Sequence, residues 1–173
     1  IVSLQESWFI EYGNRGWKDK VHKNLDAIDI KPEERRGDYN HTIDWLESWP
    51  CIRNYGLGTK LPFDDNFIIE PLSDSTIYMA FYTIRHIIDD VSPRKLKDSF
   101  FDYVFNEKGT AEEVADKTGI ELETVEKARE SFAYWYPMDY RMSGHDLVQN
   151  HLTFMMYHHT ALFDERNWPQ GIS

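Results

Sequence analysis

Apolar residues recur at helical spacing along much of this chain, with short strand-like runs between them. Four large apolar residues spaced four, four and three positions apart predict a helix over 16–29. Pro32 suits a first helical turn, so a second helix is expected from there to Leu46. The run Thr76–Ile88 is apolar on nearly all sides and predicts a well-buried helix.

The remaining runs predict short strands, turns and an insertion of small helices. Strands are expected at 1–12, 67–70 and 139–143, and the Gly- and Pro-containing stretch 49–65 is expected to be loop-like. Residues 91–133 predict two or three short helices. A further helix is expected from about residue 145 to 163, followed by a loop over 164–171. This order favours an α/β layer with a helical insert, in a helix-rich chain.

Composition narrows the class of protein. A chain of 173 residues with 41% hydrophobic and 15% aromatic residues can bury a core as one domain, or as a piece of a larger one. Its single cysteine, Cys51, excludes an internal disulfide and fits a reducing compartment. No apolar run approaches ~20 residues, so no membrane span is expected. We expect a cytoplasmic protein whose first residues, IVSLQESW, lie inside a longer chain.

The net charge of −11 argues against a nucleic-acid partner held by this chain alone. Affinity for nucleic acid comes mainly from Lys and Arg at phosphates. Other parts of the protein would therefore have to provide most of the binding to any nucleic acid.

The segment Tyr134–Leu152 carries the most specific chemistry. The expected strand ends in Ser143-Gly144, and Asp146 follows just before a helix start. Nucleotides bind at such turns at the carboxyl ends of strands in open α/β sheets. Gly144 would let a ligand approach the backbone, and Asp146 could accept hydrogen bonds from ribose hydroxyls. A plain helix cap after a strand is the alternative.

The sequence supports two other kinds of site, a metal site and a hydrolase triad, less well. His151, His158 and His159 share one expected helix with Asp146 nearby, but they lack the tight ligand spacing of a zinc site, and we expect no metal. Ser75, Asp146 and His151 could form a hydrolase triad, but the chain has no G-x-S-x-G elbow.

Two further segments have both a structural and a functional interpretation. Residues 111–132 have the apolar spacing and central glycine of a helix-turn-helix. The stretch 107–130 carries eight acids and four bases, a net charge of −4, which disfavours DNA. A packed helical insert is the structural alternative. In the aromatic helix, Tyr78 and Tyr82 share a face and could line a small pocket near Ser75, or simply pack in the core.

Three ordered motifs together resemble one family. They are SWPCIRNYGLGTKLPF (Ser48–Phe63), EPLSDSTIYMAFY (Glu70–Tyr82) and YWYPMDYRMSGHDLVQNHL (Tyr134–Leu152), the last followed by NWPQGI at 167–172. Each is similar to a motif of class I aminoacyl-tRNA synthetases, in the divergent form of archaeal and eukaryotic-type leucyl-tRNA synthetases. The resemblance covers nearly the whole chain.

The resemblance implies the second half of a Rossmann-type class I synthetase catalytic domain with a helical insertion. Its implied map is a return segment from the editing domain (1–35), a first catalytic part (36–90), a helical connective insertion (91–133) and the nucleotide-binding strand and helix (134–173). The parent would join leucine to tRNA(Leu) through leucyl-adenylate, with ATP as substrate and Mg²⁺ accompanying it. No DNA or membrane partner is implied.

Residue roles carry over by motif position. The implied ATP-binding residues are Gly144, His145 and Asp146, although His145 stands where many relatives have Lys, which puts a fixed charge there in doubt. The implied leucine-binding residues are Ser75, Tyr78 and His151. Arg53 is implied to lie on the path of the tRNA 3′ end.

The chain lacks the HIGH and KMSKS motifs, which supply charge stabilisation at the α-phosphate in this family. We therefore expect no catalytic residue here and no activity from the chain alone. One methylene is worth only ~1–3 kcal/mol, so leucine selection would also need the editing domain. Two alternatives stay open: a helical interaction or DNA-binding module centred on 91–133, and a different nucleotidyl-transferring enzyme on the same fold.

Overall fold

The computed structural model describes residues 7–173, which divide into two compact units. The first unit contains the described residues up to Ile77, together with 140–162 and 169–173, and the second contains 78–139 and 163–168. The described chain is helix-rich with small sheets, which is compatible with part of an α/β protein. No helix within residues 7–173 has the length and apolarity needed to cross a membrane.

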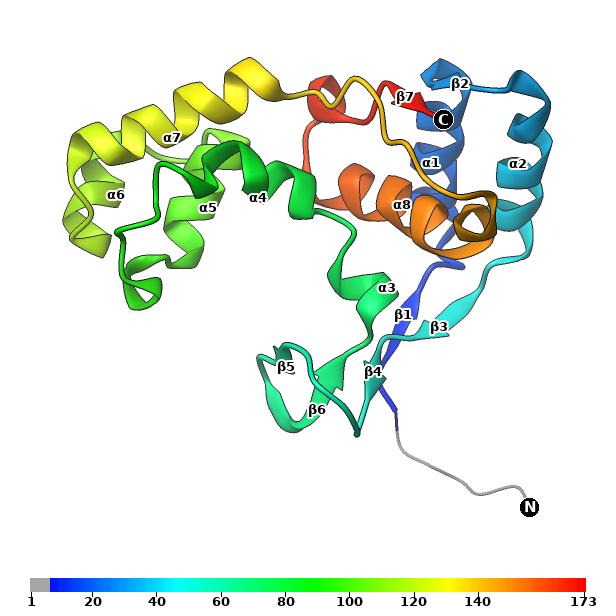
Figure 1. Cartoon of the computed structure of the whole chain (residues 1–173), viewed down its shortest axis with the longest axis horizontal. Coiled ribbons are helices and arrows are strands. Elements are labelled where there is room, and N and C mark those ends of the chain that lie inside the picture. Colours follow the sequence, from blue (N-terminus) through cyan, green and yellow to red (C-terminus); the bar gives the residue numbers. More distant parts are fainter. Residues whose placement is uncertain (1–6) are drawn as a thin grey trace. The chain divides into compact units, whose positions relative to one another are not determined.

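The first unit combines short strands with longer helices (Figure 1). Its elements are β1 (Phe9–Glu11), α1 (Arg15–Ala27), β2 (Asp29–Ile30), α2 (Arg36–Trp45), β3 (Ser48–Pro50), β4 (Ile52–Arg53), β5 (Lys60–Leu61), β6 (Asp64–Ile69), α3 (Pro71–Asp74), α8 (Thr153–Leu162) and β7 (Gly171–Ile172). The strand expected over 1–12 is present as β1, and its first six positions lie outside the described residues.

Helix α1 follows the predicted apolar stripe. It begins where the side chain of Asn14 accepts a hydrogen bond from the Trp17 amide at 3.1 Å, which satisfies one of the free amides of the first turn. The helix buries Val21 and Leu25 and packs against α8. The Trp17 indole fastens the two helices together by donating to the carbonyl oxygen of Tyr157 at 2.8 Å.

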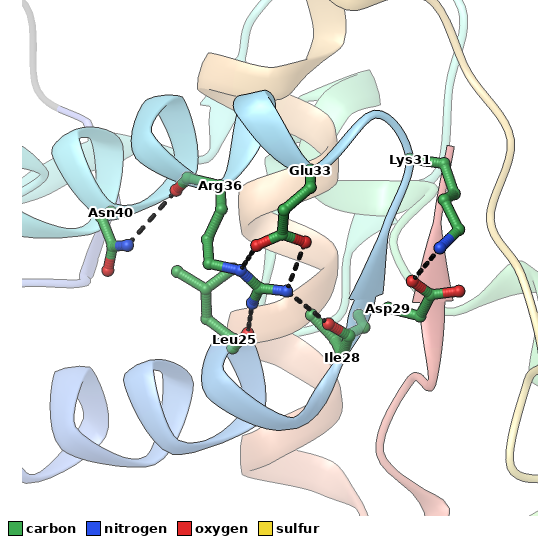
Figure 2. Close-up of polar contacts among 7 residues, drawn as sticks. All are labelled: Leu25, Ile28, Asp29, Lys31, Glu33, Arg36 and Asn40. Atoms are coloured by element: carbon green, nitrogen blue, oxygen red, sulfur yellow. Dashed lines mark hydrogen bonds and ion pairs between the residues drawn. The ribbon is translucent and has the colours of Figure 1, made fainter.

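Arg36, the first residue of α2, closes the other end of α1 (Figure 2). Its guanidinium donates to the carbonyl oxygens of Leu25 and Ile28, the latter at 2.9 Å, and pairs with Glu33. A cation at the carboxyl end of a helix satisfies free carbonyls and complements the helix dipole. Arg36 therefore fixes the connection between α1 and α2.

The first unit contains a short parallel ladder. β2 pairs in parallel with β7 (Figure 1). Arg141 forms a parallel bridge to Ile172 on the other side of β7. Three chain segments thus run in the same direction with β7 in the middle. Their carboxyl ends lie at one edge, the position at which open α/β sheets bind ligands.

The stretch 49–65, expected to be loop-like, contains strands. β3 pairs antiparallel with β1, and β4 and β5 both pair antiparallel with β6. The expectation of a loop was wrong because β3, β4 and β5, of two or three residues each, are too short to show alternation among the glycines and prolines.

The second unit is helical. Its helices are α4 (Tyr78–Arg85), α5 (Asp98–Asn106), α6 (Ala111–Thr118) and α7 (Leu122–Trp135). α5, α6 and α7 confirm the predicted short helices. The expectation that Thr76–Ile88 forms a well-buried helix was only partly right. α4 starts at Tyr78 and buries Ala80 and Ile84, but Tyr82 is 67% exposed.

Candidate functional site

The strand-to-helix turn around Gly144 lies beside the parallel ladder formed by β2, β7 and Arg141. The Arg141 amide donates to Gly171 O at 2.9 Å, and the Ser143 amide donates to Ser173 O at 2.9 Å. The strand expected over 139–143 is reduced to the single bridge at Arg141. The hydrogen bond from Ser143 to Ser173 continues the contact past this bridge.

Gly144 lies directly beside the Asp146 carboxylate and has an ordinary backbone angle. Its φ of −69° and ψ of 150° are open to any residue. A Cβ at this position would lie 2.5 Å from Oδ1 of Asp146, closer than real contacts allow. The exposed Asp146 carboxylate therefore folds back over the glycine of the turn.

The helix after the turn is irregular, and this irregularity positions His151. A 3₁₀ turn (His145–Leu147) is followed by a π turn (Val148–Leu152) that continues into α8. The hydroxyl of Thr153 donates to Val148 O, five residues back, at 2.6 Å. Single π turns occur frequently at functional sites. Within this π turn, the His151 side chain is buried, with only 4% of its surface exposed.

His151 is a buried, neutral imidazole. Its Nδ1 atom lies 3.3 Å from Ser75 Oγ and 3.5 Å from Leu72 O, and burial lowers its pKa. The buried Nε2 atom has no hydrogen-bond partner among residues 7–173. The Ser75 hydroxyl donates to Pro71 O at 2.8 Å, so its proton is directed away from the imidazole, unlike that of a hydrolase nucleophile.

The two later histidines have structural partners. His158 is within hydrogen-bonding distance of Tyr12 and Thr76 through its two ring nitrogens, at 3.0 and 2.5 Å, and burial lowers its pKa to about 4. The ring of His159 lies 2.8 Å from Met155 O. No group of three or more His, Cys, Asp or Glu side chains within residues 7–173 is arranged to hold a metal ion.

Two further expected site residues are Tyr78, in the second unit, and Arg53, in the first. Tyr78 opens α4 in the second unit, where its ring meets that of Tyr82 edge-on at 5.1 Å. Arg53 borders a cavity of about 380 Å³ in the first unit, with Trp49, Phe67 and Glu70 among its lining. The Arg53 guanidinium donates to Leu57 O.

Two small cavities adjoin the turn at the carboxyl ends of the parallel segments. One, of about 210 Å³, is lined by Ile30, Tyr39, Gly144 and Ile172, and the other, of about 220 Å³, by Asp38, Asp146 and Gln149. Arg35 and His145 line both cavities. Arg35, Asp38 and Gln149 do not stand out in the sequence, because only the fold brings the start of α2 beside His145.

The helices of the second unit pack on one another. α7 contacts α4, α5 and α6, and the buried side chains include Phe100, Val104, Val114, Val125 and Phe132. The apolar positions that suggested a helix-turn-helix therefore form a core. Together with the acidic charge of this stretch, this packing disfavours a DNA-binding module.

Comparison with known proteins identifies the chain. No family model matches it. It is 48% identical over 169 residues to a leucine–tRNA ligase of Methanopyrus kandleri, 50% over 175 residues to leucine–tRNA ligase 2 of Saccharolobus solfataricus, and 48% over 182 residues to the leucine–tRNA ligase of Pyrococcus horikoshii. The chain belongs to the leucyl-tRNA synthetase family.

The match to these leucyl-tRNA synthetases covers 98–100% of this chain but only 18–19% of each relative. The chain therefore corresponds to one segment of the synthetase, and the resemblance stated from its motifs is confirmed. All three relatives are archaeal, as the motif variants predicted.

Proposed function

We propose that this chain forms the part of a cytoplasmic leucine–tRNA ligase that holds leucine and the adenosine of ATP. The parent would convert leucine, ATP and tRNA(Leu) into leucyl-tRNA, AMP and pyrophosphate through leucyl-adenylate, with Mg²⁺ accompanying ATP. The observation that carries this proposal is the turn from Gly144 to Asp146 at the carboxyl ends of parallel strand segments, in a chain so similar to leucine–tRNA ligases.

The ribose would lie on this turn. The exposed Asp146 carboxylate is an acceptor for ribose hydroxyls, and the absence of a side chain on Gly144 leaves the backbone open to the sugar. His145 lies beside them and would face the nucleotide. The chemistry at the α-phosphate would rely on positioning and charge stabilisation supplied elsewhere in the parent.

For leucine, the motif positions support Ser75, Tyr78 and His151 as the binding residues. A neutral, buried imidazole suits an apolar side chain, because it brings no charge into the pocket. The contact between Ser75 and His151 supports a shared role for these two residues. Arg53, in its cavity with aromatic walls, would meet the tRNA 3′ end.

The motifs also support a position for this chain within the whole synthetase. The chain would be the second half of a Rossmann-type catalytic domain, with 1–35 returning from the editing domain and 91–133 forming the connective insertion between 36–90 and 134–173. Without the HIGH and KMSKS motifs, the chain would bind substrates but not activate leucine by itself.

ATP–pyrophosphate exchange tests the proposal. The full-length enzyme should exchange with leucine and with none of the other nineteen amino acids, and the isolated chain should show no exchange. Exchange with another amino acid would remove the leucine assignment. Leucine-dependent exchange by the isolated chain would show that the missing motifs are not required.

A further inference from the structure

The cavity of about 220 Å³ beside the turn is lined by Arg35, Asp38, His145, Asp146, Val148 and Gln149. The one arginine and two aspartates of this lining have a summed formal charge of −1. A phosphate group would be repelled by such a lining. The cavity therefore suits an uncharged group with several hydrogen-bonding atoms, such as a sugar or a base.

Asp38 is held in this cavity by two contacts. Its Oδ2 atom lies 3.1 Å from Nη1 of Arg35 and 3.6 Å from Nε2 of His145. Both contacts use the same oxygen, so Oδ1 keeps its capacity to accept a further hydrogen bond. The hydrogen bond from Arg35 is the main cause that lowers the pKa of Asp38, which keeps the group an acceptor only.

Contacts with the end of α1 hold the start of α2, the helix that carries Asp38, in place. Arg36, two residues before Asp38, donates to carbonyl oxygens at the end of α1, and Lys31 pairs with Asp29 at 2.7 Å (Figure 2). The hydroxyl of Tyr140, just before the turn, donates to the same Asp29 carboxylate. These contacts tie the start of α2 and the turn to one another, so Asp38 and Asp146 stand in a defined relationship.

We infer that Asp38 and Gln149 recognise the adenine base of the nucleotide whose ribose lies on Asp146. The Asp38 carboxylate would accept a hydrogen bond from the exocyclic amine of adenine, and the Gln149 amide would donate to a ring nitrogen. This inference rests on the ribose role proposed for Asp146. It goes beyond that role by explaining how the site would distinguish ATP from nucleotides with another base.

Guanine carries a carbonyl oxygen where adenine carries its amine. That oxygen would face the ionised Asp38 carboxylate, so two acceptors would meet without a proton between them. Sites that present a fixed polar group to the substrate reject analogues that leave the group unpaired. The enzyme should therefore prefer ATP to GTP, and Asp38 should be responsible for a large share of that preference.

The test is the KM for ATP and the inhibition constant of GTP in leucine-dependent ATP–pyrophosphate exchange by the full-length enzyme. Asp38→Asn should reduce the preference for ATP over GTP by about 10- to 100-fold, since the amide can donate to the guanine oxygen. Asp44→Asn is the matched control, because Asp44 lies on the same helix and contacts His22 at 3.1 Å away from the cavity. It should leave the preference unchanged.

Gln149→Leu provides a second variant with little risk to folding, because Gln149 is exposed. It should raise the KM for ATP. An unchanged ATP-to-GTP preference in Asp38→Asn, with an unchanged KM in Gln149→Leu, would overturn the inference. Asp146→Ala separates the two proposals: if it weakens ATP and GTP alike while Asp38→Asn has no effect, the ribose role stands and base recognition falls. If Asp146→Ala has no effect either, both fall.

Discussion

The Oγ atom of Ser75 lies 3.3 Å from Nδ1 of His151, although the two residues are 76 positions apart in the chain. This contact joins the loop after α3 to the π turn that precedes α8. It brings together two of the three residues expected at the leucine pocket. Because His151 is buried and its pKa is lowered, the pair presents no charge.

Replacing His151 tests the leucine pocket. His151→Asn removes most of the ring and should raise the KM for leucine by about tenfold, with little change in the KM for ATP. Exchange kinetics with each substrate varied in turn give both constants. His41→Asn is the control, because His41 is exposed on α2 and should leave both unchanged. An equal effect on both KM values would show a structural role instead.

A methyl group at position 144 should displace the carboxylate of Asp146. In Gly144→Ala the new Cβ would meet Oδ1 of Asp146 at 2.5 Å and displace the carboxylate, so the KM for ATP should rise by about tenfold or more. Gly37→Ala is the matched control on α2, where a Cβ meets nothing within 4 Å. It should stabilise the protein by about 0.5–1 kcal/mol without changing the KM. A Gly144→Ala enzyme with normal kinetics would contradict the close approach.

Acid should destabilise the first unit through His158. Burial lowers its pKa to about 4, below the unfolded value of 6.5, so the unfolded chain binds the proton more readily. The contribution of the neutral ring is fully present above pH 6.5 and is lost as the pH falls toward 4.

The measurement is urea denaturation of the chain at several pH values, for wild type and His158→Gln. Between pH 7 and 4.5, wild type should lose about 2 kcal/mol more stability than the variant, whose side chain does not titrate. Parallel pH profiles for the two proteins would show that His158 is not buried as described.

Arg129 should contribute more to the stability of the second unit than its neighbour Lys127 does. Its side chain is 15% exposed, donates to Val104 O at 2.7 Å and pairs with Glu107. Arg129→Ala should cost about 1.5–3 kcal/mol of unfolding free energy. Lys127→Ala, which breaks an exposed pair with Glu123 one turn away, should change the unfolding free energy little. Urea denaturation compares the two variants, and equal losses would contradict the difference in burial.

The helices were predictable and the strands largely were not. The stripe from Trp17 to Ile28 specifies one face of α1, so the periodicity is sufficient by itself. The ladder of β2, β7 and Arg141 involves only one or two residues per segment and depends on pairing between distant parts of the chain. Such a ladder leaves no local pattern to detect.

The site was predictable only as far as its motifs extend. Gly144 and Asp146 stand out because a small residue and an acid follow a strand-like run. Asp38 lies in an ordinary helical segment, and its contact with His145 exists only because Arg36 holds the start of α2 against α1. The π turn that buries His151 likewise has no counterpart in the apolar pattern.

The ribose role of Asp146 is the central claim, and ATP–pyrophosphate exchange by the full-length enzyme tests it most directly. Asp146→Ala should raise the KM for ATP by about tenfold or more and leave the KM for leucine nearly unchanged, since a hydrogen-bonded carboxylate is lost only from the nucleotide site. Asp116→Ala, at an exposed carboxylate on α6, should behave as wild type. Equal KM values for ATP in Asp146→Ala and wild type would contradict the claim.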